Sequence, residues 1–267
     1  MTRSHRDPRG RRPGFPRRSI NRWLALVPIA WAAPAVAEAP VSEVRDVHGF
    51  HALSIAGSGE VTARRGAREQ VRVEALPDVL ERIVTEVDDG VLKIYHKPGL
   101  RFWEREGPVR IDITYVVLDG MDLSGSARVT TDALAAESFT VEISGSARVD
   151  VEAIRAQALR VQVTGSGSLT SSGLEAERAE VTVSGSGHVT LAGSVDTEHV
   201  SVLGSGEVDN GALKSRDASA LVSGSGRISL WVEDSLDAKI GGSGDIEYRG
   251  DPTVHRQISG SGELRRH

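Results

Sequence analysis

The sequence predicts an all-β fold, a right-handed parallel β-helix or β-solenoid with coils of about 20 residues. The tripeptide Gly-Ser-Gly, or its variant Gly-Ser-Ala, occurs nine times. After the first copy the intervals between copies are 18 to 20 residues, which is typical of stacked repeat units. The first glycines of the nine copies are Gly57, Gly125, Gly145, Gly165, Gly185, Gly204, Gly224, Gly242 and Gly260.

Aliphatic residues flank every copy of this tripeptide at the same two positions. Two residues before the first glycine the column runs from Ile55 to Ile258, and four residues after it from Val61 to Leu264. This alternation with polar residues predicts half-buried β-strands. The third position after the first glycine is polar in every copy and changes sign, as in Arg148, so it should face water. The serine shares that side, and the glycines should face inward or form a bend.

An antiparallel β-meander is the alternative, in which Gly-Ser-Gly would be a three-residue hairpin loop. The solenoid is favoured because equivalent residues repeat in type from copy to copy, as expected when each stacks on its counterpart. A second apolar stretch also lies between successive copies, as in Leu134 to Phe139 and Ile154 to Leu159. This stretch predicts a further short strand that closes each coil.

Residues 41–118 are less regular, but we expect them to begin the same solenoid with longer coils. Asp88-Asp89-Gly90 predicts a tight turn between two of the expected strands. The expected strands are Val71–Glu74, Ile83–Val87, Val91–Tyr95 and Val109–Val117.

Residues 1–37 predict a cleaved secretory signal peptide, and residues 38–267 a single solenoid domain. Eight arginines and one acid precede an apolar run from Trp23 to Ala37, which ends in the small-residue cleavage pattern Ala35-Val36-Ala37. The alternative is a membrane anchor, but the run is shorter than the roughly 20 apolar residues that span a bilayer. Pro28 and Pro34 also interrupt it. The exported protein should be periplasmic, secreted or at the cell surface.

The charge and the lack of cysteine exclude several kinds of partner and chemistry. The chain has 32 basic and 37 acidic residues, and without residues 1–37 the net charge is near −12. Such an acidic protein should bind neither nucleic acid nor an anionic membrane surface, and no membrane insertion is expected. Without cysteine there can be no disulfide, thiol catalysis or zinc–thiolate site.

No motif of this sequence predicts an active site, a metal site or a cofactor. No copy of the glycine motif continues to a dinucleotide-binding or P-loop pattern, and no G-x-S-x-G elbow occurs. We therefore expect no catalytic residue, no metal and no cofactor. Phe102 and Trp103, which stand among charged residues, are the candidate contact for a partner. Their alternative role is to fill an apolar gap or to cap the solenoid.

Three segments together with the Gly-Ser ladder resemble the head GIN domain family, labelled "putative auto-transporter adhesin". They are Val47–Gly59, Val87–Ile94 and Ile240–Pro252, and the resemblance covers residues 44–264. It implies a secreted, β-helix-like domain and supplies no catalytic residues. We therefore expect a non-enzymatic, adhesin-like binding module of the bacterial envelope whose ligand is an unknown protein or glycan. A polysaccharide-processing enzyme and a purely structural periplasmic protein are the alternatives.

Overall fold

The structure is a computed structural model that describes residues 39–97 and 107–267, all within one compact unit, Glu38–His267. These residues are nearly all in β-strands, with one short helix. The all-β prediction is therefore confirmed. The expected signal peptide at residues 1–37 and the residues Phe102 and Trp103 lie outside the described residues.

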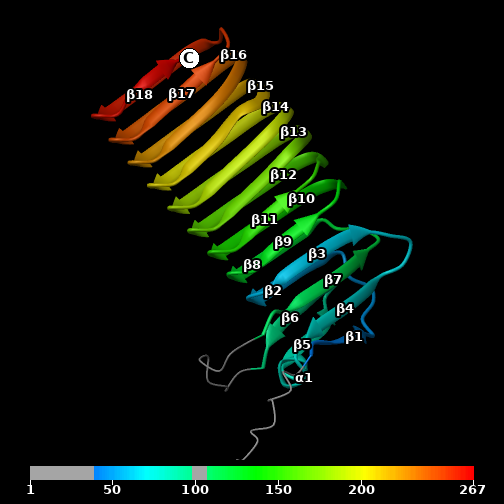
Figure 1. Ribbon diagram of the computed structural model, residues 1–267. Coiled ribbons are helices and arrows are strands. Elements are labelled where there is room, and N and C mark those ends of the chain that lie inside the picture. Colours follow the sequence, from blue (N-terminus) through cyan, green and yellow to red (C-terminus); the bar gives the residue numbers. More distant parts are fainter. Residues whose placement is uncertain (1–38, 98–106) are drawn as a thin grey trace, which may run out of the picture. The chain divides into compact units, whose positions relative to one another are not determined.

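The repeats fold into successive strands that share one pattern of pairing. In chain order the strands are β8 (Gly120–Gly125), β9 (Arg128–Thr131), β10 (Leu134–Gly145), β11 (Arg148–Val151), β12 (Ile154–Gly165), β13 (Ser168–Gly185), β14 (His188–Gly204), β15 (Glu207–Gly224), β16 (Arg227–Gly242), β17 (Asp245–Arg249), β18 (Thr253–Gly260) and β19 (Leu264–Arg266). Figure 1 shows them stacked side by side along one axis, from β8 to β18.

Every pairing among β8 to β19 is parallel and joins residues one repeat apart. Val163 pairs with Val183, and Gly165 pairs with Gly185. This in-register parallel stacking confirms the solenoid, and the antiparallel meander is therefore wrong.

Each coil has three faces, which are named here by their order around the coil. The first face is the segment that ends at the Gly-Ser pair, such as residues 158–165, which stack on residues 178–185. The second face follows the tripeptide, as in residues 148–151, which stack on residues 168–171. The third face is the extra strand predicted between the copies, as in residues 154–156, which stack on residues 174–176.

The aliphatic columns form the core, and the tripeptide makes the corner between the first and second faces. Val163 and Val183 are fully buried. Gly185 has a φ of +119°, and a Cβ there would lie 2.6 Å from the carbonyl oxygen of Gly165, so only glycine fits. Ser186 faces solvent, and its backbone N–H donates to the Gly165 carbonyl oxygen at 2.8 Å. The predicted bend and the outward serine column are both present.

The N-terminal part differs from the expected run of longer coils. Its strands β6 and β7 pair in parallel with β2 and β3, but β2 and β3 also pair with β8 and β9 on their other side. The coil of β2 and β3 therefore lies between the coil of β6 and β7 and the coil of β8 and β9. The stacking order of these coils differs from their order in the chain. The elements are β1 (Val41–Arg45), β2 (Ala52–Gly57), β3 (Glu60–Arg65), β4 (Gln70–Ala75), α1 (Pro77–Leu80), β5 (Ile83–Asp88), β6 (Val91–His96) and β7 (Arg110–Tyr115).

Antiparallel strands cover the end of the solenoid at the coil of β6 and β7. β4 pairs antiparallel with β7 and with β1, while β5 pairs antiparallel with β6. The turn between β5 and β6 has Asp89 at φ +48° and Gly90 at φ +76°, which confirms the predicted tight turn. These strands cover edges of β6 and β7 that would otherwise expose unpaired backbone groups.

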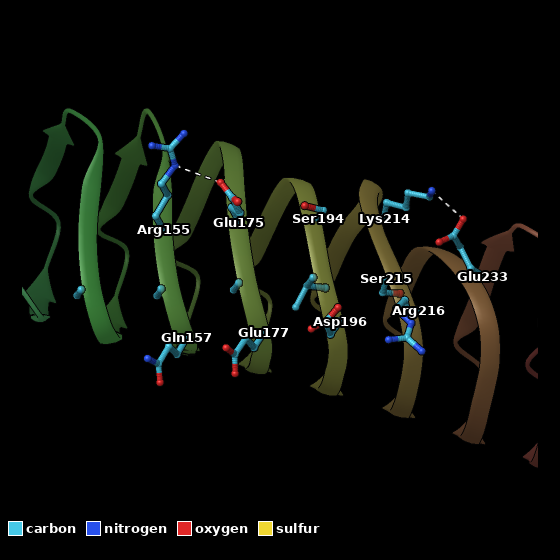
Figure 2. A pocket seen from close by; sticks show the side chains of 14 residues that line it. Arg155, Gln157, Glu175, Glu177, Ser194, Asp196, Lys214, Ser215, Arg216 and Glu233 are labelled. Atoms are coloured by element: carbon cyan, nitrogen blue, oxygen red, sulfur yellow. Dashed lines mark hydrogen bonds and ion pairs between the residues drawn. The ribbon is translucent and has the colours of Figure 1, made fainter.

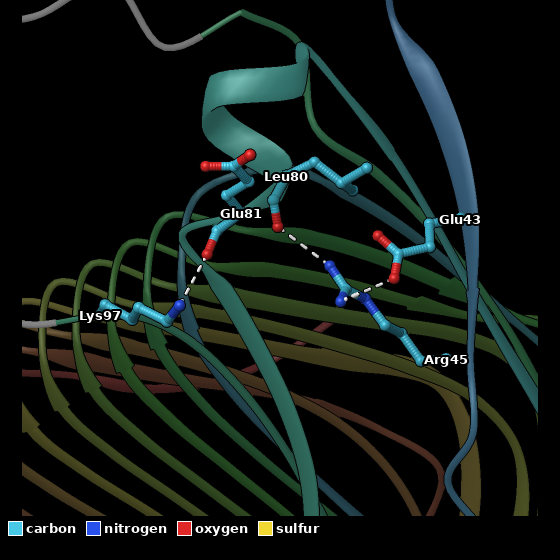
Figure 3. Close-up of polar contacts among 5 residues, drawn as sticks. All are labelled: Glu43, Arg45, Leu80, Glu81 and Lys97. Carbon is cyan, nitrogen blue, oxygen red and sulfur yellow. Dashed lines mark hydrogen bonds and ion pairs between the residues drawn. The ribbon is translucent and has the colours of Figure 1, made fainter.

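Two long basic side chains satisfy backbone carbonyl groups around α1 (Figure 3). Arg45 donates to the carbonyl oxygen of Leu80 at 2.9 Å and is ion-paired with Glu43 at 3.1 Å. Lys97 donates to the carbonyl oxygen of Glu81 at 2.9 Å. Because the last carbonyl groups of a helix have no intrahelical partner, these contacts connect the end of α1 to strand β1 and to Lys97, the residue that follows β6.

Candidate functional site

A shallow groove runs across the third face of six successive coils and has a volume of about 680 Å³. Figure 2 shows its side chains, which rise from neighbouring strands. We call it the third-face groove. It is lined by Ala136, Arg155, Ala156, Gln157, Glu175, Ala176, Glu177, Ser194, Val195, Asp196, Lys214, Ser215, Arg216 and Glu233.

The floor of the third-face groove is a column of small side chains in register. Ala136 pairs with Ala156, which pairs with Ala176, and all three are half-buried. Val195 and Ser215 continue the column on the next two coils. Methyl groups at these positions keep the floor low, because longer side chains would fill the hollow. The alanine repeat at a spacing of 20 residues was visible in the sequence and would have pointed to this floor.

One wall consists of charged side chains that are paired with each other along the stack. Arg155 Nε lies 3.1 Å from Glu175 Oε2, and Lys214 Nζ lies 2.7 Å from Glu233 Oε1 (Figure 2). Ser194 stands between these two pairs. The charges of this wall therefore compensate one another.

The opposite wall carries uncompensated negative charge at its centre. Gln157, Glu177, Asp196 and Arg216 follow one another along it (Figure 2). Arg216 is paired outward with Asp234 at 3.4 Å. Within residues 39–97 and 107–267, Glu177 and Asp196 have no ion-pair partner. A ligand in the groove therefore meets two free carboxylates above a partly apolar floor.

A buried polar network lies directly beneath the floor. Glu198 has no exposed surface, and Asn210 donates an amide proton to Glu198 Oε1. Ser215, a floor residue, approaches the same carboxyl group but donates its hydroxyl proton to the Trp231 carbonyl oxygen at 3.1 Å. Glu198 Oε2 has no hydrogen-bond partner among the described residues. Burial raises the pKa of Glu198 from 4.5 to about 7.

Trp231 stands beside one end of the groove and is half-buried between two cations. Lys214 Nζ lies 5.9 Å from the centre of its ring, and the Arg249 guanidinium lies 5.7 Å from it. Contacts of this kind hold basic side chains over an aromatic face. They fix the position of Lys214 at the rim of the groove.

The residues that the structure describes contain no group of three or more His, Asp or Glu side chains arranged to hold a metal ion. His48 and His51 contact separate carboxylates, Asp46 at 2.8 Å and Asp119 at 3.0 Å. In the same part of the chain, no helix has the length and apolar character needed to cross a bilayer.

Known proteins resemble this chain along most of its length. A family model described as "Putative auto-transporter adhesin, head GIN domain" matches residues 49–174 and 172–252. No curated protein matches the chain. Three crystal structures share the fold at TM-scores of 0.81, 0.82 and 0.77, with 24%, 18% and 22% identity.

These three structures come from the genus Parabacteroides. The first is described as a "putative lipid binding protein" from P. distasonis. The alignment covers 86% of this chain and 97% of that protein. The other two are described as putative adhesins. The alignment covers 86% of this chain and 96% of the P. merdae protein, and 85% of this chain and 97% of the second P. distasonis protein. At these identities the likeness extends to the fold alone.

Proposed function

The chain belongs to the head GIN domain family of "putative auto-transporter adhesins", and on this basis we propose that it is an exported, non-enzymatic binding module of the bacterial cell envelope. Its ligand is an extended protein or glycan segment of an envelope or surface partner. Adhesion takes place in the third-face groove. A cleaved signal peptide at residues 1–37 delivers the protein to the periplasm or the cell surface.

The groove is the observation that carries this proposal. It crosses six coils, and at roughly 4.8 Å per coil it offers a binding surface on the order of 20 Å long. Its open shape suits an extended chain better than a small substrate, which enzymes usually enclose. The alanine floor accepts the apolar part of such a chain, and Glu177 and Asp196 accept hydrogen bonds or a basic group from it.

The distribution of charge supports binding rather than turnover. Most charged side chains of the walls are paired with one another, as in Arg155–Glu175 and Lys214–Glu233. Glu198, whose carboxyl pKa is raised to about 7, is fully buried beneath the floor. A general acid or base must reach its substrate, and Glu198 does not reach the groove.

The test is the binding of the labelled, exported chain to isolated envelope fractions and to arrays of glycans and extracellular proteins. Glu177→Lys should weaken the binding at least tenfold by reversing a charge at the centre of the groove. Glu142→Lys is the matched control, because it makes the same change at an exposed position of the first face. Thermal melts should show both variants folded.

Two results would contradict the proposal. Equal binding by the Glu177→Lys and Glu142→Lys variants would remove the groove from the binding site. An activity screen on acidic polysaccharides would overturn the non-enzymatic assignment if it found turnover that a single substitution abolishes.

A further inference from the structure

We propose that a second surface site, on the second face of the solenoid, binds an acidic glycan through Arg128 and Arg148. We call it the arginine site. It surrounds a hollow of about 520 Å³ that is lined by Arg128, Arg148, Asp150, Ser168, Thr170 and His188. It goes beyond the proposed function, because it lies on a different face from the third-face groove and shares no residue with it.

The two arginines place two positive charges side by side on adjacent coils. Arg128 and Arg148 are direct register partners on the parallel strands β9 and β11. Among the strand pairings that the structure describes, no other places two Arg or Lys residues in direct register. Like charges placed opposite each other on adjacent strands are destabilising.

Elsewhere an arginine is joined by the register to a glutamate at several places, and one further pair of like charge is acidic, Asp122 with Glu142. Arg155 meets Glu175 at 3.1 Å, and Arg160 meets Glu180 at 2.9 Å, each one coil apart. The arginine site therefore keeps a repulsion that a single acidic substitution would have converted into an ion pair. Such a cost is expected where the two positive charges receive an anionic group from outside.

No acidic side chain within the described residues neutralises either arginine. Glu60 is the register neighbour of Arg128 on its other side, but its carboxylate is paired with Arg110 at 3.5 Å. Arg148 donates from Nε to the hydroxyl oxygen of Ser168 at 3.2 Å. This bond holds the guanidinium in place and leaves its two terminal nitrogens for a ligand.

The chemistry of the site favours a carboxylate or sulfate ester on a hydroxyl-rich chain. The guanidinium fork matches the two oxygens of such a group, and two forks about 4.8 Å apart can hold neighbouring groups of one polymer. The hydroxyl groups of Ser168 and Thr170 line the same hollow and can bond sugar hydroxyls.

The surrounding charge argues against more highly charged polymers. Asp150 lies within the hollow, and the whole chain carries a net charge of −5. A nucleic acid, with a phosphate at every nucleotide, would be repelled by this field. An acidic glycan, whose charges are separated by neutral hydroxyl groups, fits two arginines in an otherwise acidic surface.

The test measures the binding of the full chain to four probes in low and moderate salt by biolayer interferometry. The probes are polyuronate oligosaccharides, a sulfated glycan, neutral dextran and polyglutamate. We expect binding to a uronate or sulfated glycan that weakens with salt, and none to dextran. The acidic glycan that binds with the higher affinity shows whether the site prefers a carboxylate or a sulfate ester.

The variants assign the binding to this site. The double substitution of Arg128 and Arg148 by Ala should lower the affinity at least about tenfold, since each removes hydrogen bonds between charged groups. Arg148→Lys should also lose affinity, because lysine keeps the charge but not the fork. Arg160→Ala is the control, an exposed arginine of the first face that is paired with Glu180. The double variant should melt no lower than wild type, since a repulsion is removed.

Three outcomes would overturn the inference. They are the absence of binding to both acidic glycans, equal affinities of the double variant and the Arg160→Ala variant, and equal binding of polyglutamate. The Glu177→Lys variant should bind the acidic glycan as wild type does. A failure here therefore leaves the proposed role of the third-face groove unaffected, and the reverse also holds.

Discussion

Glu198 should make the stability of the solenoid depend on pH, and Glu198→Gln should remove that dependence. The side chain is fully buried, and its register partners on the two neighbouring coils are Ala179 and Ala218. Asn210 donates to one carboxyl oxygen, and the other has no hydrogen-bond partner among the described residues. Burial disfavours the charged form and raises the pKa to about 7.

The sign and size of the effect follow from this pKa. In the unfolded chain the glutamate returns to about 4.5, so between about 4.5 and 7 the folded state binds more protons than the unfolded state. The free energy of unfolding therefore falls as the pH rises through this window. A difference of roughly 2.5 units at 1.36 kcal/mol each amounts to about 3 kcal/mol. A glutamine keeps the Asn210 contact without a titrating proton.

Denaturant melts of the full chain at pH 5 and pH 8 measure this difference. The wild type should lose roughly 2 to 3 kcal/mol more than the Glu198→Gln variant between these two values. Glu177→Gln is the control, because Glu177 is exposed, and its melts should follow those of the wild type. If wild type and Glu198→Gln show the same pH dependence, the carboxyl group is hydrated or paired in solution, and this reasoning is wrong.

Three further predictions concern the core, the corner and export. Val183→Asp should cost several kcal/mol in denaturant melts, because it buries an unpaired carboxylate, whereas His188→Ala on the exposed column should change stability by no more than about 0.5 kcal/mol. Gly185→Ala should cost about 2 kcal/mol or more because of its positive φ, and clearly more than Ser186→Ala at the exposed neighbouring position; equal losses would contradict this interpretation of the corner. N-terminal sequencing of the envelope protein should begin at Glu38, and an intact N-terminus in an integral membrane fraction would instead support the anchor.

The repeated part of the fold could be predicted because each coil stacks on a near copy of itself. Equivalent residues then share one environment, so eight of the nine residues in the column of Val163 and Val183 are buried, and only Ile258 in the last coil is exposed. The mixed charges in the column of Arg148 reported exposure in the same way. The two alanines at the third tripeptide position, Ala127 and Ala147, are buried, so a methyl group fits in those two coils, whereas a Cβ at Gly187 would lie 2.5 Å from Val163 Cγ1.

The N-terminal part could not be predicted in this detail because no sequence repeat indicates which of its strands pair. The local signals were sufficient for strands β4 to β7 and for the turn at Gly90. The position of β2 between β6 and β8 depends on contacts between distant segments, and no single strand sequence encodes the order of coils. The third-face groove was missed for a related reason, since its walls combine columns of mixed residue type.

In a solenoid of this kind, function is best sought where a residue departs from its own column at an energetic cost. The column that holds Phe139, Leu159 and Ala179 continues with Glu198, which is a buried acid at a position where the neighbouring coils have apolar side chains. Arg148 faces Arg128 where the other register pairs of charges are mostly of opposite sign. The scaffold requires neither, because the remaining coils stack without them. Each departure is visible in the aligned repeats, but only the structure shows that one lies beneath the groove and the other faces solvent beside the hydroxyl groups of Ser168 and Thr170.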